Sequence, residues 1–291
     1  MNKYSFIIFI VLGCIWGSNF IYMKLAAQMI EPMQVVFYRT LFGFIPVFLY
    51  ALYSKALKFE DLKYFYHFFV MSLLAAIVYF FGFVKGSFLL LSGVAGALSG
   101  AIPLFSFILA ALFLKDEKIS RFSLLGVAFG FLGVLFISKV FQENIMDSNI
   151  EGIFYLLMGS LSVGASFIYA KKFLIPLQIK PAALTTYQLG FAVIILFFIT
   201  DFEGINNVWN SFYVSMGLVI GLGLLGTGIA YILYYHVIAT LGAIKASSIT
   251  YIPPVVALGI GAILIGEDIK MVDYLGTALI FIGVFLINKK K

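Results

Sequence analysis

Few ionisable side chains lie inside the long apolar segments of this sequence, and all of them are basic. They are Arg39, Lys85, His236, His67 and Lys245, and no Asp or Glu falls near the middle of any apolar segment. A charge in an apolar medium is costly unless it is paired or hydrated, so each of these residues is a functional hypothesis. A fixed positive charge favours binding of an anionic group such as a carboxylate. The lack of buried carboxylates argues against an organic-cation site and against a carboxylate proton relay.

Uncharged polar side chains at helical spacing provide a second set of candidates. Trp16, Asn19 and Met23 share one helical face, and Tyr22 lies beside Asn19. Tyrosines could hold an aromatic or amphipathic substrate by stacking and a hydroxyl group. In a chain that is 18% aromatic, however, most rings must pack helices together. We predict that the substrate-binding residues are Trp16, Asn19, Tyr22, Tyr79, Lys85, Ser99, Ser166, Tyr169, Tyr231, Tyr235, Ser247 and Tyr251.

The elements that carry these residues are apolar helices. With 63% apolar and 11% charged residues, the chain cannot make an ordinary water-soluble surface. The apolar residues form runs of about 20, the length at which a helix crosses a hydrocarbon layer of about 30 Å. The predicted fold is an all-α integral membrane protein with ten transmembrane helices, which span Tyr4–Leu25, Pro32–Tyr53, Tyr64–Leu89, Gly93–Leu114, Phe122–Lys139, Gly152–Lys171, Ala182–Thr200, Phe212–Ile238, Gly242–Ile265 and Met271–Ile287.

The basic residues predict the orientation of these helices. If the N-terminus is inside, 14 of the 19 basic residues lie at the inner ends of the helices, as the positive-inside rule requires. We therefore predict a multi-pass protein of the cell (plasma or inner) membrane with both termini in the cytoplasm. This placement explains the net charge of +6 better than a nucleic-acid partner does. The expected partners are the lipid bilayer and a small-molecule substrate.

The second half of the chain repeats the first. Residues 102–139 and 252–289 are identical at 13 of 38 positions, where chance would give roughly 4. Nearer the start of each half, the repeat opposes Asn19 with Ser166 and Tyr22 with Tyr169. Each half holds five helices, and an odd number makes the second half enter the membrane from the opposite side. We predict inverted five-helix repeats at 1–145 and 146–291, with a binding site at their interface that suits alternating access or a channel.

Two prolines and two glutamates mark equivalent places in the repeats. Pro103 and Pro253 each remove a backbone donor and free a carbonyl one turn earlier. Such a group is tolerated at membrane depth only against protein or water. We therefore assign both prolines a structural or gating role near the substrate, with a simple kink as the alternative. Glu117 and Glu267 lie at equivalent helix ends and are interpreted as structural markers of the fold.

Several short stretches of the sequence form a recognisable pattern. They are "WGSNF" in the first helix, "FYRTLFGF" around Arg39, and two runs from a proline to a glutamate, "P…LFLKDEKI" and "P…ILIGEDI". Together they resemble the EamA-type branch of the drug/metabolite transporter superfamily. The resemblance covers essentially the whole chain. It implies ten helices in two inverted repeats, a central cavity, and export or exchange of small metabolites such as amino acids. The first helix departs from the small multidrug branch, which carries a glutamate where this chain has Asn19.

Arg39, Lys85 and His236 each allow two interpretations. Because arginine is usual at this place in the family, we expect Arg39 to bind helix-end carbonyls or loop carboxylates, with gating as its functional alternative. Lys85 lies about two turns below the outer end of its helix, where it could orient a substrate carboxylate or extend to the outer headgroups. His236 could couple transport to protons, or lie at the membrane interface, as we expect for His67.

These observations predict a secondary transporter that exports or exchanges a small carboxylate-bearing metabolite such as an amino acid. The alternatives are an exporter of multidrug or lipid-like amphiphiles and a passive channel. An enzyme is not expected, because the apolar segments hold no nucleophile with a base, no His-x-x-x-His and no paired carboxylates. The sequence has one cysteine, Cys14, and no nucleotide-binding loop. It therefore predicts no cofactor, no metal site and no coupling to ATP hydrolysis.

Overall fold

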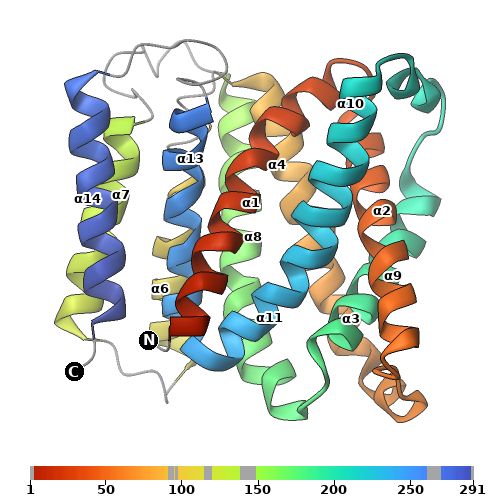
Figure 1. Ribbon diagram of the computed structural model, residues 1–291, viewed down its shortest axis with the longest axis horizontal. Coiled ribbons are helices and arrows are strands. Elements are labelled where there is room, and N and C mark those ends of the chain that lie inside the picture. Colours follow the sequence, from red (N-terminus) through yellow and green to blue (C-terminus); the bar gives the residue numbers. More distant parts are fainter. Residues whose placement is uncertain are drawn as a thin grey trace.

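The computed structural model describes residues 3–90, 95, 98–114, 120–137, 149–260 and 270–289, and every regular element in these ranges is a helix (Figure 1). The predicted marker residues Glu117 and Glu267 lie outside the described residues. The helices are α1 (Lys3–Ala27), α2 (Pro32–Tyr53), α3 (Phe65–Ser72), α4 (Val78–Leu89), α6 (Ile102–Phe113), α7 (Arg121–Ile137), α8 (Ile150–Tyr169), α9 (Pro181–Ile199), α10 (Phe212–Met216), α11 (Ala230–Leu241), α12 (Ala243–Ser247), α13 (Ile252–Ile260) and α14 (Met271–Asn288).

Most of these helices are long enough to cross a membrane. In the described part of the chain, seven helical stretches combine the necessary length and apolar character, and the shorter apolar helices α6 and α7 accompany them. The predicted span Pro32–Tyr53 coincides with α2, whose first residue is the proline. A proline suits the first turn of a helix because its missing N–H has no intrahelical partner there. The count of ten membrane-spanning helices stays a prediction.

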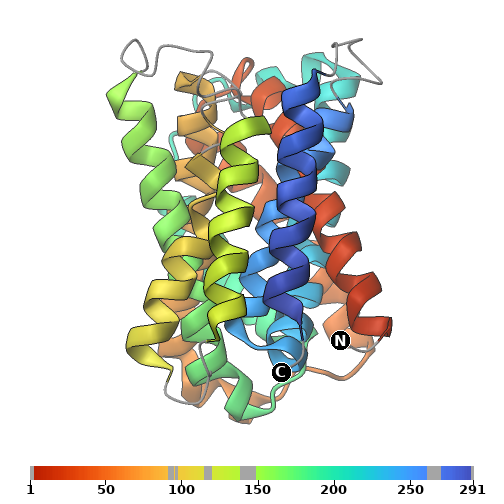
Figure 2. The ribbon, with the colours of Figure 1, turned by 90° about the vertical axis from the view of Figure 1, so that its left-hand side faces the viewer.

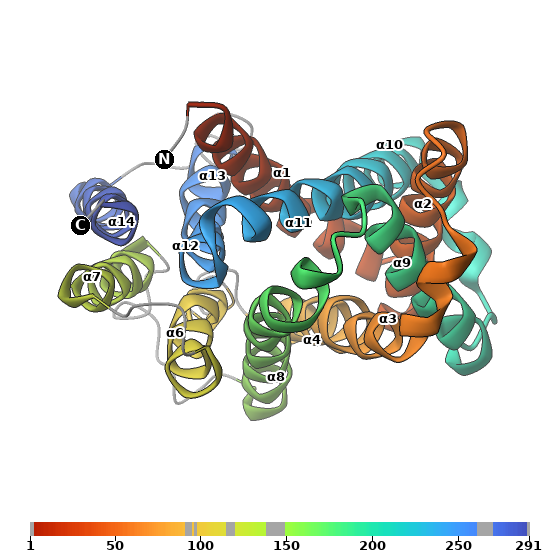
Figure 3. The same cartoon turned by 90° about the horizontal axis from the view of Figure 1, so that it is seen from below.

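The long helices run roughly parallel to one another, and both ends of the chain lie at one face of the bundle, which we call the lower face (Figure 1). The opposite face is the upper face. Helix α1 starts at the lower face, whereas α8 starts at the upper face (Figure 2). Seen from below, α7 and α14 form a pair at one end of the bundle, and α2, α3 and α9 lie at the other end (Figure 3).

A π-helical turn at 73–77 joins α3 to α4 and supplies acceptors for neighbouring helices. A π turn shifts the backbone bonds by one residue and so leaves carbonyl groups that need other partners. The hydroxyl of Ser162 donates to the carbonyl oxygen of Leu74 at 2.7 Å, and the hydroxyl of Tyr231 donates to that of Ala75. Two second-half helices, α8 and α11, are thereby fixed to the first half.

Glycines allow α7 and α14 to approach closely. A Cβ atom added at Gly133 would lie 2.6 Å from the carbonyl oxygen of Gly276, and one added at Gly276 would lie 2.8 Å from the carbonyl oxygen of Gly133. Small residues at such positions are typical of helix pairs in membranes, where close van der Waals packing drives association. The repeat of the sequence pairs Gly133 with Gly283 and Gly126 with Gly276, and all four glycines lie where α7 and α14 touch.

We expect Gly276→Ala to lower the thermal unfolding temperature of the purified protein by several degrees. The added methyl group would press on backbone atoms of α7, and overpacking of this kind costs about 1–3 kcal/mol. Gly259→Ala in α13 is the matched control, since a Cβ atom there would meet no described atom within 4 Å. Equal unfolding temperatures for the two variants, measured by a thermal-shift assay in detergent, would contradict the predicted close packing.

Candidate functional site

A cavity lies in the interior of the bundle, next to the start of α6. Its volume is about 20 Å³, which is room for about one water. It is therefore nearly closed in this conformation. The lining residues are Trp16, Asn19, Phe20, Met23, Arg39, Tyr79, Phe83, Ser99, Ile102, Thr250 and Pro253.

Arg39 carries the one charge in this lining. Its side chain is 2% exposed. Nε donates to the hydroxyl oxygen of Thr227 at 3.2 Å, Nη1 donates to the sulfur of Met23 at 3.4 Å, and Cζ lies 3.6 Å from the ring centroid of Phe80. These contacts orient the guanidinium group through two hydrogen bonds and one cation–π contact.

None of the described partners of Arg39 is a carboxylate. A buried cation without a counter-charge is expensive, because its lost hydration is not replaced by an opposite charge. The planar guanidinium group matches a carboxylate with two parallel hydrogen bonds. The cavity thus has the donor that an anionic group needs.

Asn19 provides a second polar group in the wall. Its side chain is 4% exposed, and Oδ1 has no hydrogen-bond partner among the described residues. The amide group lies against Gly226, where an added Cβ atom would be only 2.4 Å from Oδ1. Because a buried polar atom without a partner costs free energy, Asn19 can gain a hydrogen bond from a ligand that enters the cavity.

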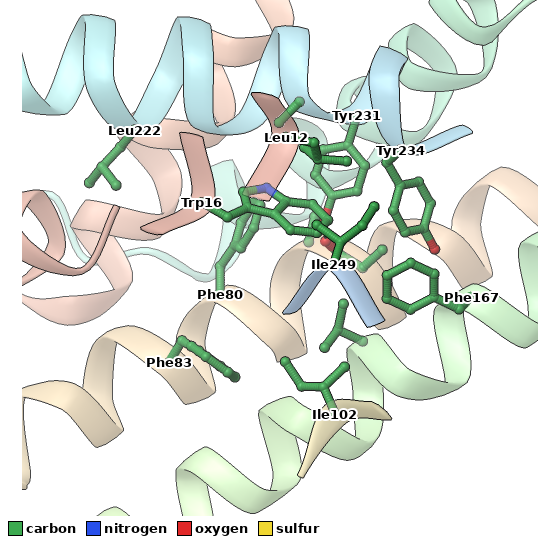
Figure 4. Close-up of a cluster of buried hydrophobic side chains, with 14 of the residues drawn as sticks. Leu12, Trp16, Phe80, Phe83, Ile102, Phe167, Leu222, Tyr231, Tyr234 and Ile249 are labelled. Carbon is green, nitrogen blue, oxygen red and sulfur yellow. The ribbon is translucent and has the colours of Figure 1, made fainter. Parts of the chain in front are cut away.

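An aromatic floor, whose side chains are drawn in Figure 4, adjoins the cavity at Trp16, on the side where α1 leads to the lower face. We define it as Trp16, Phe167, Tyr231 and Tyr234, all of which are buried. The ring centroids of Phe167 and Tyr234 are 4.8 Å apart, and those of Trp16 and Tyr234 are 6.3 Å apart. These are ordinary distances for packed aromatic rings. The floor therefore joins α1 of the first half to α8 and α11 of the second.

The structure brings four of the predicted binding residues into the cavity wall: Trp16, Asn19, Tyr79 and Ser99. Lys85 is not among them, because it lies in a second pocket nearer the upper face.

Tyr22 also lies elsewhere, with its ring packed on Gly217 and Gly221. The helical spacing of Tyr22 and Asn19 placed them together in the sequence, but the two side chains contact different parts of the neighbouring π-helical segment 217–229.

Four other predicted binding residues use their hydroxyl groups to hold helices together. Tyr235 donates to Oε1 of Gln188, Ser166 shares a 2.8 Å hydrogen bond with Tyr234, and Tyr251 donates to the carbonyl oxygen of Val127 at 2.8 Å. Tyr231 is fixed to the π turn described above. Ser247 donates to its own helix, to the carbonyl oxygen of Ile244. These hydroxyls are committed to protein partners in this conformation.

The histidines lie away from the cavity wall. Nδ1 of His67 is 2.7 Å from the hydroxyl oxygen of Tyr169, a residue that we predicted to bind substrate. This contact links α3 of the first half to α8 of the second. The ring of His236 packs edge-on against Tyr4, and its Nε2 has no hydrogen-bond partner among the described residues. Neither histidine lines the cavity, and a coupling role for His236 stays a prediction.

The two predicted prolines begin helical segments beside the cavity. Pro103 is the second residue of α6 and Pro253 the second residue of α13. Pro253 lines the cavity directly, whereas α6 contributes the neighbouring Ile102. Ser106 points away and donates to the carbonyl oxygen of Gly164 at 3.2 Å. Pro253 thus lies in the wall of the candidate site and Pro103 lies next to a wall residue, and their gating role stays a prediction.

The sequence patterns do not single out Thr227, Thr250 or Gln188 as candidate site residues. Thr227 lies in a π-helical segment, donates to the carbonyl oxygen of Leu222 at 2.8 Å and orients Arg39. The repeat held a signal for Gln188, because the offset that pairs Tyr38 with Tyr187 also pairs Arg39 with Gln188. Gln188 is fully buried, and its Nε2 has no hydrogen-bond partner among the described residues.

Comparison with known families identifies the chain. The model of the EamA-like transporter family matches residues 4–139 and again residues 150–289. The chain belongs to the EamA-like transporter family. It is therefore a multi-pass membrane transporter of a small-molecule substrate and not an enzyme. The resemblance seen in the sequence is confirmed.

Relatives of this EamA-family chain are named as transporters. The uncharacterized transporter YoaV of Bacillus subtilis is 28% identical over 94% of this chain and 92% of its own length. An uncharacterized transporter of Archaeoglobus fulgidus is 26% identical over 95% of each chain. A protein of known crystal structure shares the fold, with a TM-score of 0.75 at 15% identity over 98% of this chain and 96% of its own.

Within the described residues of the EamA-family chain, no group of three or more His, Cys, Asp and Glu side chains is arranged to hold a metal ion. The chemistry that the cavity offers is thus recognition by hydrogen bonds, charge and aromatic packing.

Proposed function

We propose that this transporter moves a small carboxylate-bearing metabolite, such as an amino acid, across the membrane by alternating access. The observation that carries the proposal is the buried guanidinium of Arg39 in the cavity wall, whose described partners include no carboxylate. A substrate carboxylate would supply the missing counter-charge. Asn19 and Ser99 line the same cavity and add polar groups for the rest of the solute.

The arrangement of the two halves supports alternating access. The family model matches the chain twice, and the first helix of each match starts at an opposite face of the bundle (Figure 2). We therefore assign residues 1–145 and 146–291 as five-helix repeats of inverted orientation, with ten membrane-spanning helices in all. Inverted repeats give a molecule two related packings, each open to one side of the membrane.

The barriers around the cavity support a gated pathway over a passive channel. On the upper side, Met23 lines the cavity and Ala27 lines the pocket above it, so about one helical turn of α1 separates the two spaces. On the lower side, the aromatic floor is followed along α1 by the buried residues Leu12, Phe9 and Ser5. That barrier is about three turns thick. Opening to the upper face therefore requires the smaller rearrangement.

The distribution of charge supports a cytoplasmic lower face. The helix ends and short connections at this face (Figure 1) include the segments 54–58, 170–180 and 242–247. They carry Lys55, Lys58, Lys171, Lys172, Lys180 and Lys245. An excess of basic residues in short connections is typical of the cytoplasmic side of a membrane protein. Both termini, which lie at the same face, are accordingly assigned to the cytoplasm.

A counterflow assay tests the proposal. The purified protein is reconstituted in liposomes that contain one unlabelled solute, and uptake of the same labelled solute is followed for amino acids, dicarboxylic acids, quaternary ammonium compounds and a lysophospholipid. We expect exchange of one or more carboxylate-bearing solutes and none of the quaternary cations. Exchange of quaternary cations or of the lipid alone would favour an amphiphile exporter. Efflux of unrelated ions without exchange would favour a channel.

A further inference from the structure

A second pocket lies between the central cavity and the upper face, and we call it the upper vestibule. Its volume is about 390 Å³, measured in the same way as the 20 Å³ of the central cavity. Residues from both halves of the chain line it, among them Met29, Glu31, Lys85, Phe88, Glu203 and Asn207. Unlike the central cavity, it is already large enough to hold a small metabolite in this conformation.

The vestibule contains charges of both signs. Lys85 is half-buried and makes no hydrogen bond or ion pair with any described residue. Glu31 and Glu203 lie in the same lining with exposed side chains. A lysine that is partly withdrawn from water and has no described counter-charge gains free energy when it meets an anionic group.

The side chain of Gln34 fixes two backbone segments that line the vestibule. Nε2 of Gln34 in α2 donates to the carbonyl oxygen of Asp201 at 2.8 Å and to that of Glu203 at 2.7 Å. Its Oε1 accepts a hydrogen bond of 3.1 Å from the backbone N–H of Glu31. Gln34 therefore positions the segments that carry Glu31 and Glu203, one from each half, before any ligand arrives.

The vestibule and the central cavity share their walls. In α1 the lining passes from Met23 to Ala27, and in α4 it passes from Phe83 to Lys85 and Phe88. About one helical turn separates the two spaces. A solute that leaves the central cavity toward the upper face therefore enters the vestibule next.

We propose that the upper vestibule is a second binding site, which takes zwitterionic α-amino acids on their way between the central cavity and the upper face. Lys85 binds the carboxylate of the solute, Glu31 and Glu203 bind its ammonium group, and the apolar side chains of Met29 and Phe88 contact its side chain. This inference rests on the proposed transport function and narrows it from carboxylate-bearing solutes to those that also carry an ammonium group.

The balance of charge favours a zwitterion over a simple anion or a simple cation. One lysine and two glutamates line the pocket, so a simple anion would be attracted by one charge and repelled by two. A simple cation would leave Lys85 without its counter-charge. In a zwitterion, the carboxylate can face Lys85 while the ammonium group faces Glu31 and Glu203.

The site can be tested by protection of a cysteine from modification. Cys14 is exposed, so it is first replaced by serine, and Asn207→Cys is then introduced into the vestibule. The rate at which a membrane-impermeant thiosulfonate reagent modifies this cysteine from the upper face is measured with L-leucine, N-acetyl-L-leucine or 3-methylbutylamine present. These probes share one side chain and differ in the two charged groups. We expect L-leucine to slow modification more than about fivefold, and each of the others less than about twofold.

Variants separate this site from the central one. Lys85→Ala should abolish protection by L-leucine, and Lys85→Arg should retain it, because only the charge is needed. Arg39→Gln should leave protection intact even where transport is lost, since Arg39 does not line the vestibule. Equal protection by all three probes, no protection by L-leucine, or protection that disappears in Arg39→Gln but persists in Lys85→Ala would each overturn the inference. Loss of transport alone in Arg39→Gln would bear only on the central cavity.

Discussion

Arg39→Gln is expected to abolish transport of carboxylate-bearing solutes while the protein still folds and inserts. The variant removes the one charge in the cavity wall but keeps a side chain that can hydrogen-bond Thr227. Removing one partner of a buried charge pair costs about 2–5 kcal/mol, which corresponds to a loss of about 30-fold to 4,000-fold in apparent affinity. Counterflow of the solute identified in the liposome screen measures this loss.

Related substitutions separate charge from geometry at this position. Arg39→Lys keeps the charge but loses the planar fork, and we expect an intermediate loss of about tenfold. Arg39→Met removes the charge and keeps an apolar stem, so it should also lack transport. Its thermal unfolding temperature should equal or exceed that of the wild type, because an unpaired buried charge is costly. Transport at the wild-type rate by Arg39→Gln or Arg39→Met would exclude Arg39 as the anion-binding group.

Gly226→Ala is expected to reduce transport at least tenfold by pushing Asn19 into the cavity. A Cβ atom at residue 226 would lie 2.4 Å from Oδ1 and 2.7 Å from Nδ2 of Asn19. The cavity has room for about one water in this conformation, so a displaced amide group would occupy the space that the substrate needs. Gly259→Ala again serves as the control, because its methyl group meets no described atom within 4 Å.

A second substitution checks the cause of this effect. Asn19→Ser shortens the side chain, so the double variant Asn19→Ser with Gly226→Ala should transport faster than Gly226→Ala alone. Such coupling between two contacting residues is what a double-mutant cycle measures. If the two substitutions reduce transport independently, the collision with Asn19 is not the reason for the loss.

The general architecture was accessible from the sequence because its signals are local. Apolar runs of about 20 residues predict membrane-spanning helices whatever their neighbours are, and Pro32 marks the start of α2 by its own backbone geometry. Membership of the EamA-like family confirms the membrane class and the transport function. The repeat of Pro103 and Pro253 placed both residues near the site. The inverted orientation and the count of ten helices stay proposals that these signals support.

The residues that line the site were harder to predict. Helical spacing shows which residues share a face of a helix, but not which neighbour that face packs against. Lys85 and Arg39 are both basic residues in apolar helices, and only the packing of α2 against the π-helical segment 217–229 places Arg39 in the cavity wall. The tyrosines of α11 illustrate a second limit. Their hydroxyls donate to the π-turn carbonyl of Ala75 and to Gln188, and the spacing of the tyrosines along α11 does not predict either acceptor.

The lone cation in the cavity wall also has an electrical consequence. With an anionic solute bound, Arg39 and the solute together are neutral, so the loaded protein crosses between its two states without moving charge. The empty protein returns with the positive charge of Arg39 uncovered. A membrane potential acts on one elementary charge with about 2.3 kcal/mol per 100 mV, and an inside-negative potential favours inward return of a positive charge. For a solute with one net negative charge, the resting voltage of the membrane would therefore drive export without a coupling ion. A zwitterionic amino acid has no net charge, so the same voltage would drive its transport in neither direction.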